Sequence, residues 1–132
     1  MNRRLLFVYG TLRKRGSNHH FIETSKLIEG SCFVFGELHD TGLGYPVLQQ
    51  AGENMKVIGE LYEVTDRELQ QVDQLEGYSP SNQTNEYIRI INQVCSGNKY
   101  YEAYVYIAGD QLQYCHNLIK DGDWISYCKD KP

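Results

Sequence analysis

Apolar and aromatic side chains occur on both faces of residues 99–108 (KYYEAYVYIA) when this segment is extended as a strand. Successive side chains of a strand point to opposite faces of the sheet. One face would carry Tyr101, Ala103, Val105 and Ile107, and the other would carry Tyr100, Glu102, Tyr104 and Tyr106. An open sheet with one face in water does not need two apolar faces, whereas a small closed or strongly curled sheet covered by helices does. We therefore expect a barrel-like sheet.

Four other segments have the composition of strands. They are residues 5–9, 31–39, 55–64 and 86–95. Gly36 and Gly59 lie inside two of them, which predicts a bulge or a close approach of another backbone segment. Residues 40–46 (DTGLGYP) have the composition of a turn. Ser96-Gly97-Asn98 predicts a hairpin between the last two strands.

One helix has clear start and stop residues. Thr65 and Glu68 have the spacing of a capping box, and Gly77 is a typical residue just beyond a helix end. The pattern predicts a helix over residues 66–75. Two further short helices are predicted, near residues 21–28 and within residues 111–124.

The length of 132 residues suits one domain and is enough to bury a core without disulfides or a metal. No repeat, low-complexity tract or linker interrupts the chain. We predict a single α+β domain over residues 1–132, built on a small mixed β-barrel with flanking short helices.

The charge balance disfavours two classes of partner. Lys and Arg number 13 and Asp and Glu number 17, so the net charge is −4, which argues against nucleic acid or an anionic membrane as the main partner. No apolar run has the length of a membrane span, and we identify no secretory leader before the first strand. The four cysteines have no CxxC spacing, so we expect free thiols in a reducing cytoplasm.

Glu76 occupies an unusual position for a carboxylate. Leu69, Val72 and Glu76 are spaced i, i+3, i+7, so they share one stripe of the predicted helix. The stripe faces the core, and Glu76 also lies at the negative end of the helix dipole. Desolvation and the dipole both disfavour the charged form and raise the pKa of this side chain, which predicts a general base.

Two other interpretations of these acids remain open from spacing alone. Glu76 could reach solvent past the helix end or pair with a cation such as Arg89. Asp73 lies one turn earlier and only beside the stripe, so it is a weaker candidate, and a solvated helix residue is the more ordinary interpretation.

A second candidate feature is the loop Tyr9-Gly10-Thr11-Leu12, which follows directly on the first strand. A turn at Gly10 leaves successive N–H groups unpaired by the sheet, and such groups can bind a carboxylate or an oxyanion. A simple turn is the more common outcome of a glycine at a strand end. His19 and His20 are adjacent and have no partner at metal-ligand spacing, so we expect them in a solvated loop and predict no metal site.

Several motifs together resemble a known family. They are VYGTLR at residues 8–13, GYP at residues 44–46, LEGY at residues 75–78, and Tyr87-x-Arg89. In this order and at these separations they resemble the gamma-glutamylcyclotransferase-like family, with the closest likeness to its gamma-glutamylamine cyclotransferase type. Gly122-Asp123-Trp124 is similar to the family's Gly-Asp-Trp ending, although Asp121 stands where a serine is expected. The likeness runs from Phe7 to Trp124.

The resemblance implies a small mixed β-barrel and an activity. The activity is release of an amine or amino acid from a gamma-glutamyl group as that group closes to 5-oxoproline, with no cofactor or metal. The family's catalytic glutamate falls on Glu76. The residues implied to bind the small-molecule substrate are Tyr9, Gly10, Thr11, Leu12, Tyr45, Tyr78, Tyr87 and Arg89.

Two rival functions are weighed against this enzyme. A protein of the same fold could bind a gamma-glutamyl or amino-acid-like ligand without turnover. Thiol chemistry at Cys32 or Cys115 is the other rival, but no histidine partner is identifiable and a buried cysteine is more often structural.

Overall fold

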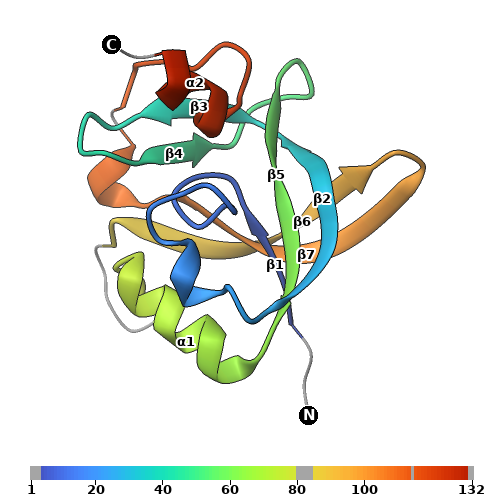
Figure 1. The fold of residues 1–132 in the computed structure, drawn as a ribbon. Helices are drawn as coiled ribbons and strands as arrows, with labels where there is room; N and C mark the ends of the chain where they lie inside the picture. Colours follow the sequence, from blue (N-terminus) through green and yellow to red (C-terminus); the bar gives the residue numbers. More distant parts are fainter. Residues whose placement is uncertain (1–3, 80–84, 114, 131–132) are drawn as a thin grey trace.

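The computed structural model describes residues 4–79, 85–113 and 115–130, and a closed five-stranded barrel forms its centre (Figure 1). The strands follow one another around the barrel in the order β1-β5-β2-β6-β7. They are β1 (Arg4–Val8), β2 (Lys26–Phe35), β5 (Lys56–Val64), β6 (Tyr87–Ser96) and β7 (Lys99–Ala108). β1 and β7 pair in parallel and close a barrel whose other pairs are antiparallel. The predicted mixed barrel is therefore confirmed.

The two apolar faces of β7 contact two different cores. Val105 packs inside the barrel in one buried cluster with Phe7 of β1. Tyr106 points to the other side, where it belongs to a second cluster with Leu6 and with Val72 of helix α1 (Asp66–Leu75). A strand with apolar side chains on both faces is thus needed because the barrel is filled inside and covered by a helix outside.

Both interior glycines predicted from the sequence mark special backbone positions. A Cβ atom on Gly59 of β5 would lie 2.2 Å from the carbonyl oxygen of Val8, so the predicted close approach is confirmed. Gly36 separates β2 from a second, two-stranded sheet of β3 (Glu37–Asp40) and β4 (Pro46–Gln49). The expectation of one strand over residues 31–39 was wrong, because the chain leaves the barrel at this glycine. The predicted turn then joins β3 to β4.

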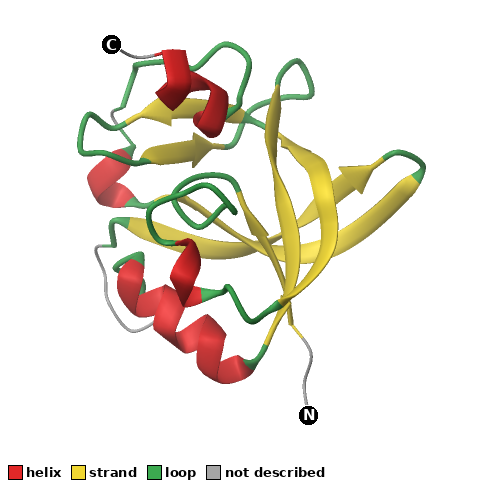
Figure 2. Ribbon diagram, viewed as in Figure 1, coloured by secondary structure: helices red, strands yellow, loops and turns green. Residues whose placement is uncertain are grey.

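The helices lie outside the barrel (Figure 2). At the start of α1, Thr65 Oγ1 accepts a hydrogen bond from the Glu68 N–H and the Glu68 carboxylate accepts one from the Thr65 N–H, so the predicted capping box is confirmed. The three remaining helical segments are short: η1 (His19–Phe21), η2 (Asp110–Leu112) and α2 (Trp124–Asp130).

Two helix predictions need correction. Residues 21–28 do not form one helix, because η1 ends at Phe21 and Leu27 already belongs to β2. The four apolar residues there form two adjacent pairs, Phe21-Ile22 and Leu27-Ile28, and do not form a continuous helical stripe. Within residues 111–124, helix is confined to the end of η2 and to Trp124, the first residue of α2, in the described part of that segment.

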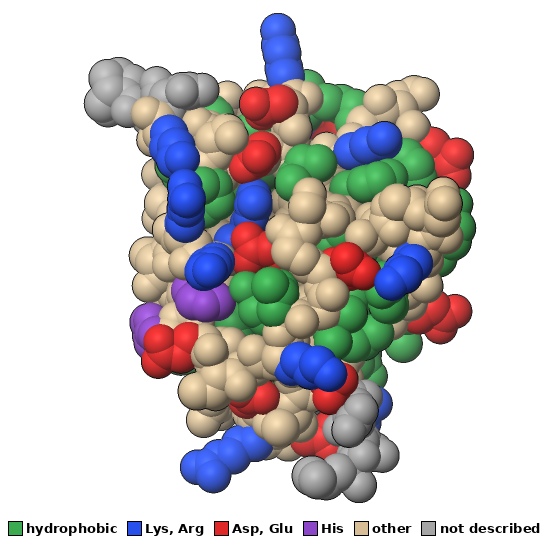
Figure 3. Space-filling view, turned by 45° about the vertical axis from the view of Figure 1, so that its right-hand side comes forward, with side chains coloured by type: hydrophobic (Ala, Val, Ile, Leu, Met, Phe, Trp, Pro, Cys, Tyr) green, Lys and Arg blue, Asp and Glu red, His purple; other side chains and the backbone are tan. Residues whose placement is uncertain are grey.

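The described surface carries charges of both signs. On the face drawn in Figure 3, Lys and Arg side chains lie among Asp and Glu side chains, with hydrophobic side chains between them. No helix among the described residues is long and apolar enough to cross a membrane. The four cysteines are free thiols, as predicted, with Cys32 and Cys95 buried.

Candidate active site

The loop after β1 presents its backbone to a cavity. Gly10, Thr11 and Leu12 all line this cavity. Among the described residues, none of their three N–H groups donates a backbone hydrogen bond, whereas the Thr11 carbonyl accepts one from the Asn18 N–H. A Cβ atom on Gly10 would lie 2.8 Å from ring carbons of Pro46, so only glycine fits between the loop and the start of β4. The predicted row of available donors is present.

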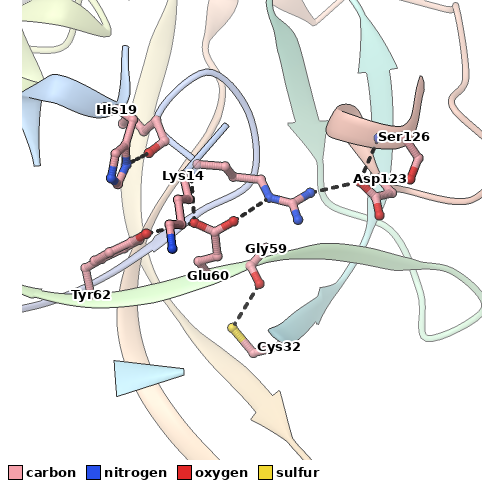
Figure 4. A network of polar contacts seen from close by, with 10 residues as sticks. Lys14, His19, Cys32, Gly59, Glu60, Tyr62, Asp123 and Ser126 are labelled. Atoms are coloured by element: carbon pink, nitrogen blue, oxygen red, sulfur yellow. Dashed lines mark hydrogen bonds and ion pairs between the residues drawn. The ribbon is translucent and has the colours of Figure 1, made fainter. Parts of the chain in front are cut away.

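Arg13 fixes this loop to Glu60 of the barrel and to Asp123 near the C-terminus, two residues that Figure 4 labels. Its guanidinium donates from Nε to Glu60 Oε2 at 3.0 Å and from Nη1 to Asp123 Oδ1 at 2.9 Å. The Lys14 N–H and the Tyr62 hydroxyl both donate to Glu60 Oε1. The buried Glu60 therefore joins the loop to β5, and no local pattern in the sequence predicts this network.

The Gly-Asp-Trp motif contributes to the same anchor. Gly122 has φ +65°, and a Cβ atom there would lie 2.0 Å from the Lys56 carbonyl oxygen, so the chain can pass β5 only with glycine. Asp123 pairs with Arg13 and also accepts a hydrogen bond from the Ser126 N–H at the start of α2. Trp124 is buried in the barrel core. The motif thus closes the barrel end and fixes the loop.

Replacing Arg13 with Met is expected to lower the free energy of unfolding by about 3 kcal/mol, because the change leaves the nearly buried Glu60 carboxylate without its cation. Urea denaturation at neutral pH measures the difference. Arg15→Met, at an exposed position of the same loop, is the matched control and should change stability little. Equal free energies for the two variants would contradict a structural role for this ion pair.

Glu76 is the C-cap residue of α1, and its N–H donates to the Val72 carbonyl at 2.9 Å. Its carboxyl group makes no hydrogen bond to any residue that the structure describes. Burial, and then the negative charges of Glu86 and Asp73, raise the pKa of Glu76 to about 8. The predicted direction is confirmed, although neighbouring acids contribute to it in a way that sequence spacing could not show.

Both ordinary interpretations of the acids on α1 are contradicted. Arg89 Nη1 donates to Asp73 Oδ2 at 2.6 Å, so this arginine pairs with Asp73 and not with Glu76. The Tyr106 hydroxyl donates to the other oxygen of Asp73. Asp73 is therefore a partly buried, paired acid and not a solvated one, and Glu76 is half-buried and lines a cavity.

The cavity that holds Glu76 has a volume of about 140 Å³. It brings the end of α1 together with the loop after β1, although these lie far apart in the sequence. Its lining residues are Phe7, Val8, Tyr9, Gly10, Thr11, Leu12, Asn18, Tyr45, Pro46, Leu75, Glu76, Glu86, Tyr87 and Tyr106.

Two tyrosine hydroxyls at this cavity serve the scaffold. The Tyr9 hydroxyl donates to the Tyr106 carbonyl at 2.7 Å and accepts from the Leu48 N–H. The Tyr87 hydroxyl donates to the Pro46 carbonyl. Burial holds the pKa of both phenols far above the usual range. These bonds fix β1, β4, β6 and β7 around the cavity, so the two rings form a rigid wall.

The remaining predicted site residues divide into two groups. Tyr45 lines the cavity, and its ring lies beside that of Tyr87. Tyr78 and Arg89 are absent from the described lining residues. The Arg89 guanidinium lies 5.5 Å from the centre of the Tyr78 ring. Tyr78 packs against the second buried cluster, which includes Val72 of α1. These two therefore brace the end of α1 from outside the cavity.

Sequence reasoning missed Asn18, Tyr106 and Glu86, which also line the cavity. The alternation of β7 places Tyr106 on the face opposite Val105, but it does not show that α1 packs against that face. Glu86 directly precedes β6 and carries no local pattern that marks a site. Only the folded backbone brings it beside Glu76.

No histidine or cysteine is among the described residues that line the cavity. No group of three or more His, Cys, Asp or Glu among them could hold a metal ion. His19 Nδ1 is instead 2.9 Å from the Leu12 carbonyl, so this ring helps to shape the loop. Burial raises the pKa of the Cys32 thiol to about 12, and neither Cys32 nor Cys115 belongs to the described cavity lining.

Comparison with known sequences finds one family model and several relatives with the same description. Residues 6–126 match the family model described as gamma-glutamyl cyclotransferase, AIG2-like. The gamma-L-glutamyl-butirosin B gamma-glutamyl cyclotransferase of Niallia circulans is 38% identical over 125 residues, which cover 92% of this chain and 76% of that protein. The protein BH1612 of Halalkalibacterium halodurans, provisionally named a gamma-glutamylcyclotransferase, is 36% identical over 76% of this chain and 87% of its own.

Comparison with solved structures finds a similar fold in a bacterial protein. YkqA from Bacillus subtilis superposes with a TM-score of 0.75 and 28% identity, covering 98% of this chain and 44% of YkqA. The present chain therefore corresponds to somewhat less than half of that larger protein.

Proposed function

The chain belongs to the gamma-glutamyl cyclotransferase, AIG2-like family, and from this premise we propose how it acts. It is an enzyme of the gamma-glutamylcyclotransferase type. The proposed reaction closes a gamma-glutamyl group to 5-oxoproline and releases the attached amine, with Glu76 as the general base and acid. The observation that carries the proposal is that Glu76 and the available N–H groups of Gly10, Thr11 and Leu12 line one cavity.

The substrate's two charged groups match the two sides of this cavity. The N–H groups of the loop would bind the α-carboxylate, since successive backbone donors form a favourable site for an anion. The α-ammonium would then lie toward Glu76, whose carboxyl group makes no hydrogen bond to a described residue. The gamma-carbonyl would lie between them, where the loop can also stabilise its developing negative charge.

Glu76 alone can accept and return every proton that the reaction moves. Its carboxylate takes a proton from the α-ammonium, and the free amine attacks the gamma-carbonyl carbon to form the ring C–N bond. The protonated carboxyl group then gives its proton to the leaving nitrogen as the old C–N bond breaks. The ring nitrogen loses its extra proton to Glu76, and the departing amine carries this proton away as an ammonium ion.

The elevated pKa suits these steps. An ordinary glutamate, with a pKa near 4.3, is a poor base toward an α-ammonium with a pKa of about 8. In this cavity the pKa of Glu76 is about 8, so a proton moves between the two groups at little cost in free energy. Ring closure is intramolecular, and oriented reactions of this kind gain up to about 7–11 kcal/mol.

We propose that the reaction needs no metal or organic cofactor, because proton transfer and charge stabilisation are both available from the chain itself. We also propose that the enzyme works in the cytoplasm. Its four free thiols are expected in a reducing compartment.

Incubation with a panel of gamma-glutamyl compounds, followed by mass spectrometry, tests the proposed reaction. The panel includes gamma-glutamyl peptides, a gamma-glutamyl-lysine isopeptide, small gamma-glutamyl amines and gamma-L-glutamyl-butirosin B. We expect equal amounts of 5-oxoproline and free amine from at least one compound, and the same yield after treatment with a chelator. Binding without any 5-oxoproline would support the alternative of a non-catalytic binding protein.

A further inference from the structure

Glu86 places a second carboxylate in the cavity beside Glu76. A Cβ atom built on Gly77, the residue after Glu76, would lie 3.5 Å from the Cβ atom of Glu86. Glu86 thus adjoins the end of α1, and both acids line the same cavity. Their carboxyl groups also interact, because the charge of Glu86 contributes to the raised pKa of Glu76.

The wall of the cavity has charge of one sign only. Its acids are Glu76 and Glu86, and none of its described lining residues is Lys, Arg or His. The nearby Arg89 is already paired with Asp73. A gamma-glutamyl group brings one positive charge, its α-ammonium, which the proposed reaction uses at Glu76. A second acid left without a cation in a partly closed site is unfavourable.

The position of Glu86 is well fixed. Its carbonyl accepts a hydrogen bond from the Gly109 N–H at 2.9 Å, and the next residue, Tyr87, is held through its hydroxyl to Pro46. Burial and hydrogen bonding to Glu86 raise the pKa of Tyr45 to about 12, so this phenol stays neutral and donates to the carboxylate. A carboxylate held in this way can select a ligand by charge, since little side-chain freedom is lost on binding.

We propose that Glu86 determines specificity by selecting gamma-glutamyl compounds whose leaving amine carries a further positive charge. The inference rests on the proposed cyclotransferase function and adds the substrate class. Glu76 receives the α-ammonium, and Glu86 pairs with the cation on the departing portion. The scissile amide is thereby held between two charged contacts at fixed positions of the wall.

Matched substrates test this proposal. The first set is the mono-gamma-glutamyl derivatives of linear diamines, and the second is the gamma-glutamyl derivatives of alkylamines of the same chain lengths, which end in a methyl group. For the wild type, kcat/KM for the best diamine derivative should exceed that of its neutral match about tenfold or more, as expected for a desolvated charge pair. In Glu86→Gln this ratio should fall to about one.

Glu102→Gln is the matched control, because Glu102 is exposed on β7 and is not among the cavity-lining residues. This variant should keep the wild-type ratio. An unchanged ratio in Glu86→Gln would overturn the proposal. An equal loss for both members of each pair would also overturn it, since Glu86 would then affect only steps that the two substrates share, through Glu76 or the common gamma-glutamyl group.

A binding measurement separates this inference from the proposed reaction. In the Glu76→Gln background, calorimetry compares the affinities of the same charged and neutral compounds with and without Glu86→Gln. A preference for the charged compound that disappears with Glu86→Gln supports the specificity assignment even if no compound gives 5-oxoproline. Turnover of the panel with equal affinities for both compounds would overturn the assignment and leave the cyclotransferase function intact.

Discussion

Glu76→Gln is expected to lower kcat/KM for 5-oxoproline formation by about a thousandfold, within the range of about 10²–10⁴ that positioned acid–base groups contribute. The amide has nearly the shape of the carboxyl group but can neither accept the α-ammonium proton nor return one to the leaving amine. Substrate should still bind, because the N–H groups of Gly10, Thr11 and Leu12 are unchanged.

The dependence of kcat/KM on pH shows whether Glu76→Gln loses activity because a base is missing or because the cavity has changed shape. With a Glu76 pKa of about 8 in the free enzyme, wild-type kcat/KM should rise with pH up to this value, since the reaction begins from the carboxylate. The residual activity of Glu76→Gln should lack this rise. Glu53→Gln, in an exposed turn, should keep the wild-type rate and profile. A Gln variant with wild-type kcat/KM would remove Glu76 from the mechanism.

The barrel and the position of Glu76 could be predicted because both leave regular patterns in the sequence. The two apolar faces of β7 require one core inside the sheet and another outside it, and the structure has both. The i, i+3, i+7 spacing of Leu69, Val72 and Glu76 places the acid on the buried stripe of α1 without knowledge of what it faces. Such patterns depend on neighbours in the chain, so one sequence suffices to recognise them.

Arg13 and Glu86 could not be predicted because their roles depend on residues distant in the chain. Arg13 lies in the basic run Arg13-Lys14-Arg15, a pattern that is ordinarily solvated, yet its guanidinium joins Glu60 of β5 to Asp123, which lies far away in the sequence. Glu86 precedes β6 and belongs to no periodic pattern of apolar residues. Only the closure of the sheet brings its Cβ atom beside the end of α1. Local pattern cannot identify a contact that depends on barrel closure.

The same reasoning explains the position of Arg89. A cation two residues after Tyr87 matches the family motif and was expected near the substrate. In the structure it pairs with Asp73 and lies over the Tyr104 ring, with its guanidinium carbon 4.7 Å from the ring centre. Its contribution is to hold the last turns of α1, and therefore Glu76, against the barrel.

Between acid and alkaline pH, Glu76→Gln should gain roughly 5 kcal/mol of unfolding free energy relative to the wild type, at about 1.4 kcal/mol per pKa unit. The pKa of Glu76 is about 8 in the folded protein and is raised from 4.5. Between these two values the unfolded chain releases the proton and the folded chain keeps it. Wild-type stability contributed by this group therefore falls as pH rises, and the loss is complete above about pH 8.

Urea denaturation of wild type and Glu76→Gln at several pH values across this window measures the effect as a difference between the two proteins. All other titrating groups are common to both, so their contributions largely cancel. Residue 76 of the Gln variant has no proton to lose. The free energy of unfolding of the variant should therefore rise relative to that of the wild type as pH rises, until the difference becomes constant near pH 8. Glu53→Gln should follow the wild type throughout, because its carboxyl group is exposed. A difference independent of pH would mean that residue 76 titrates normally, and a base of ordinary strength would be mismatched to the α-ammonium that the proposed reaction must deprotonate.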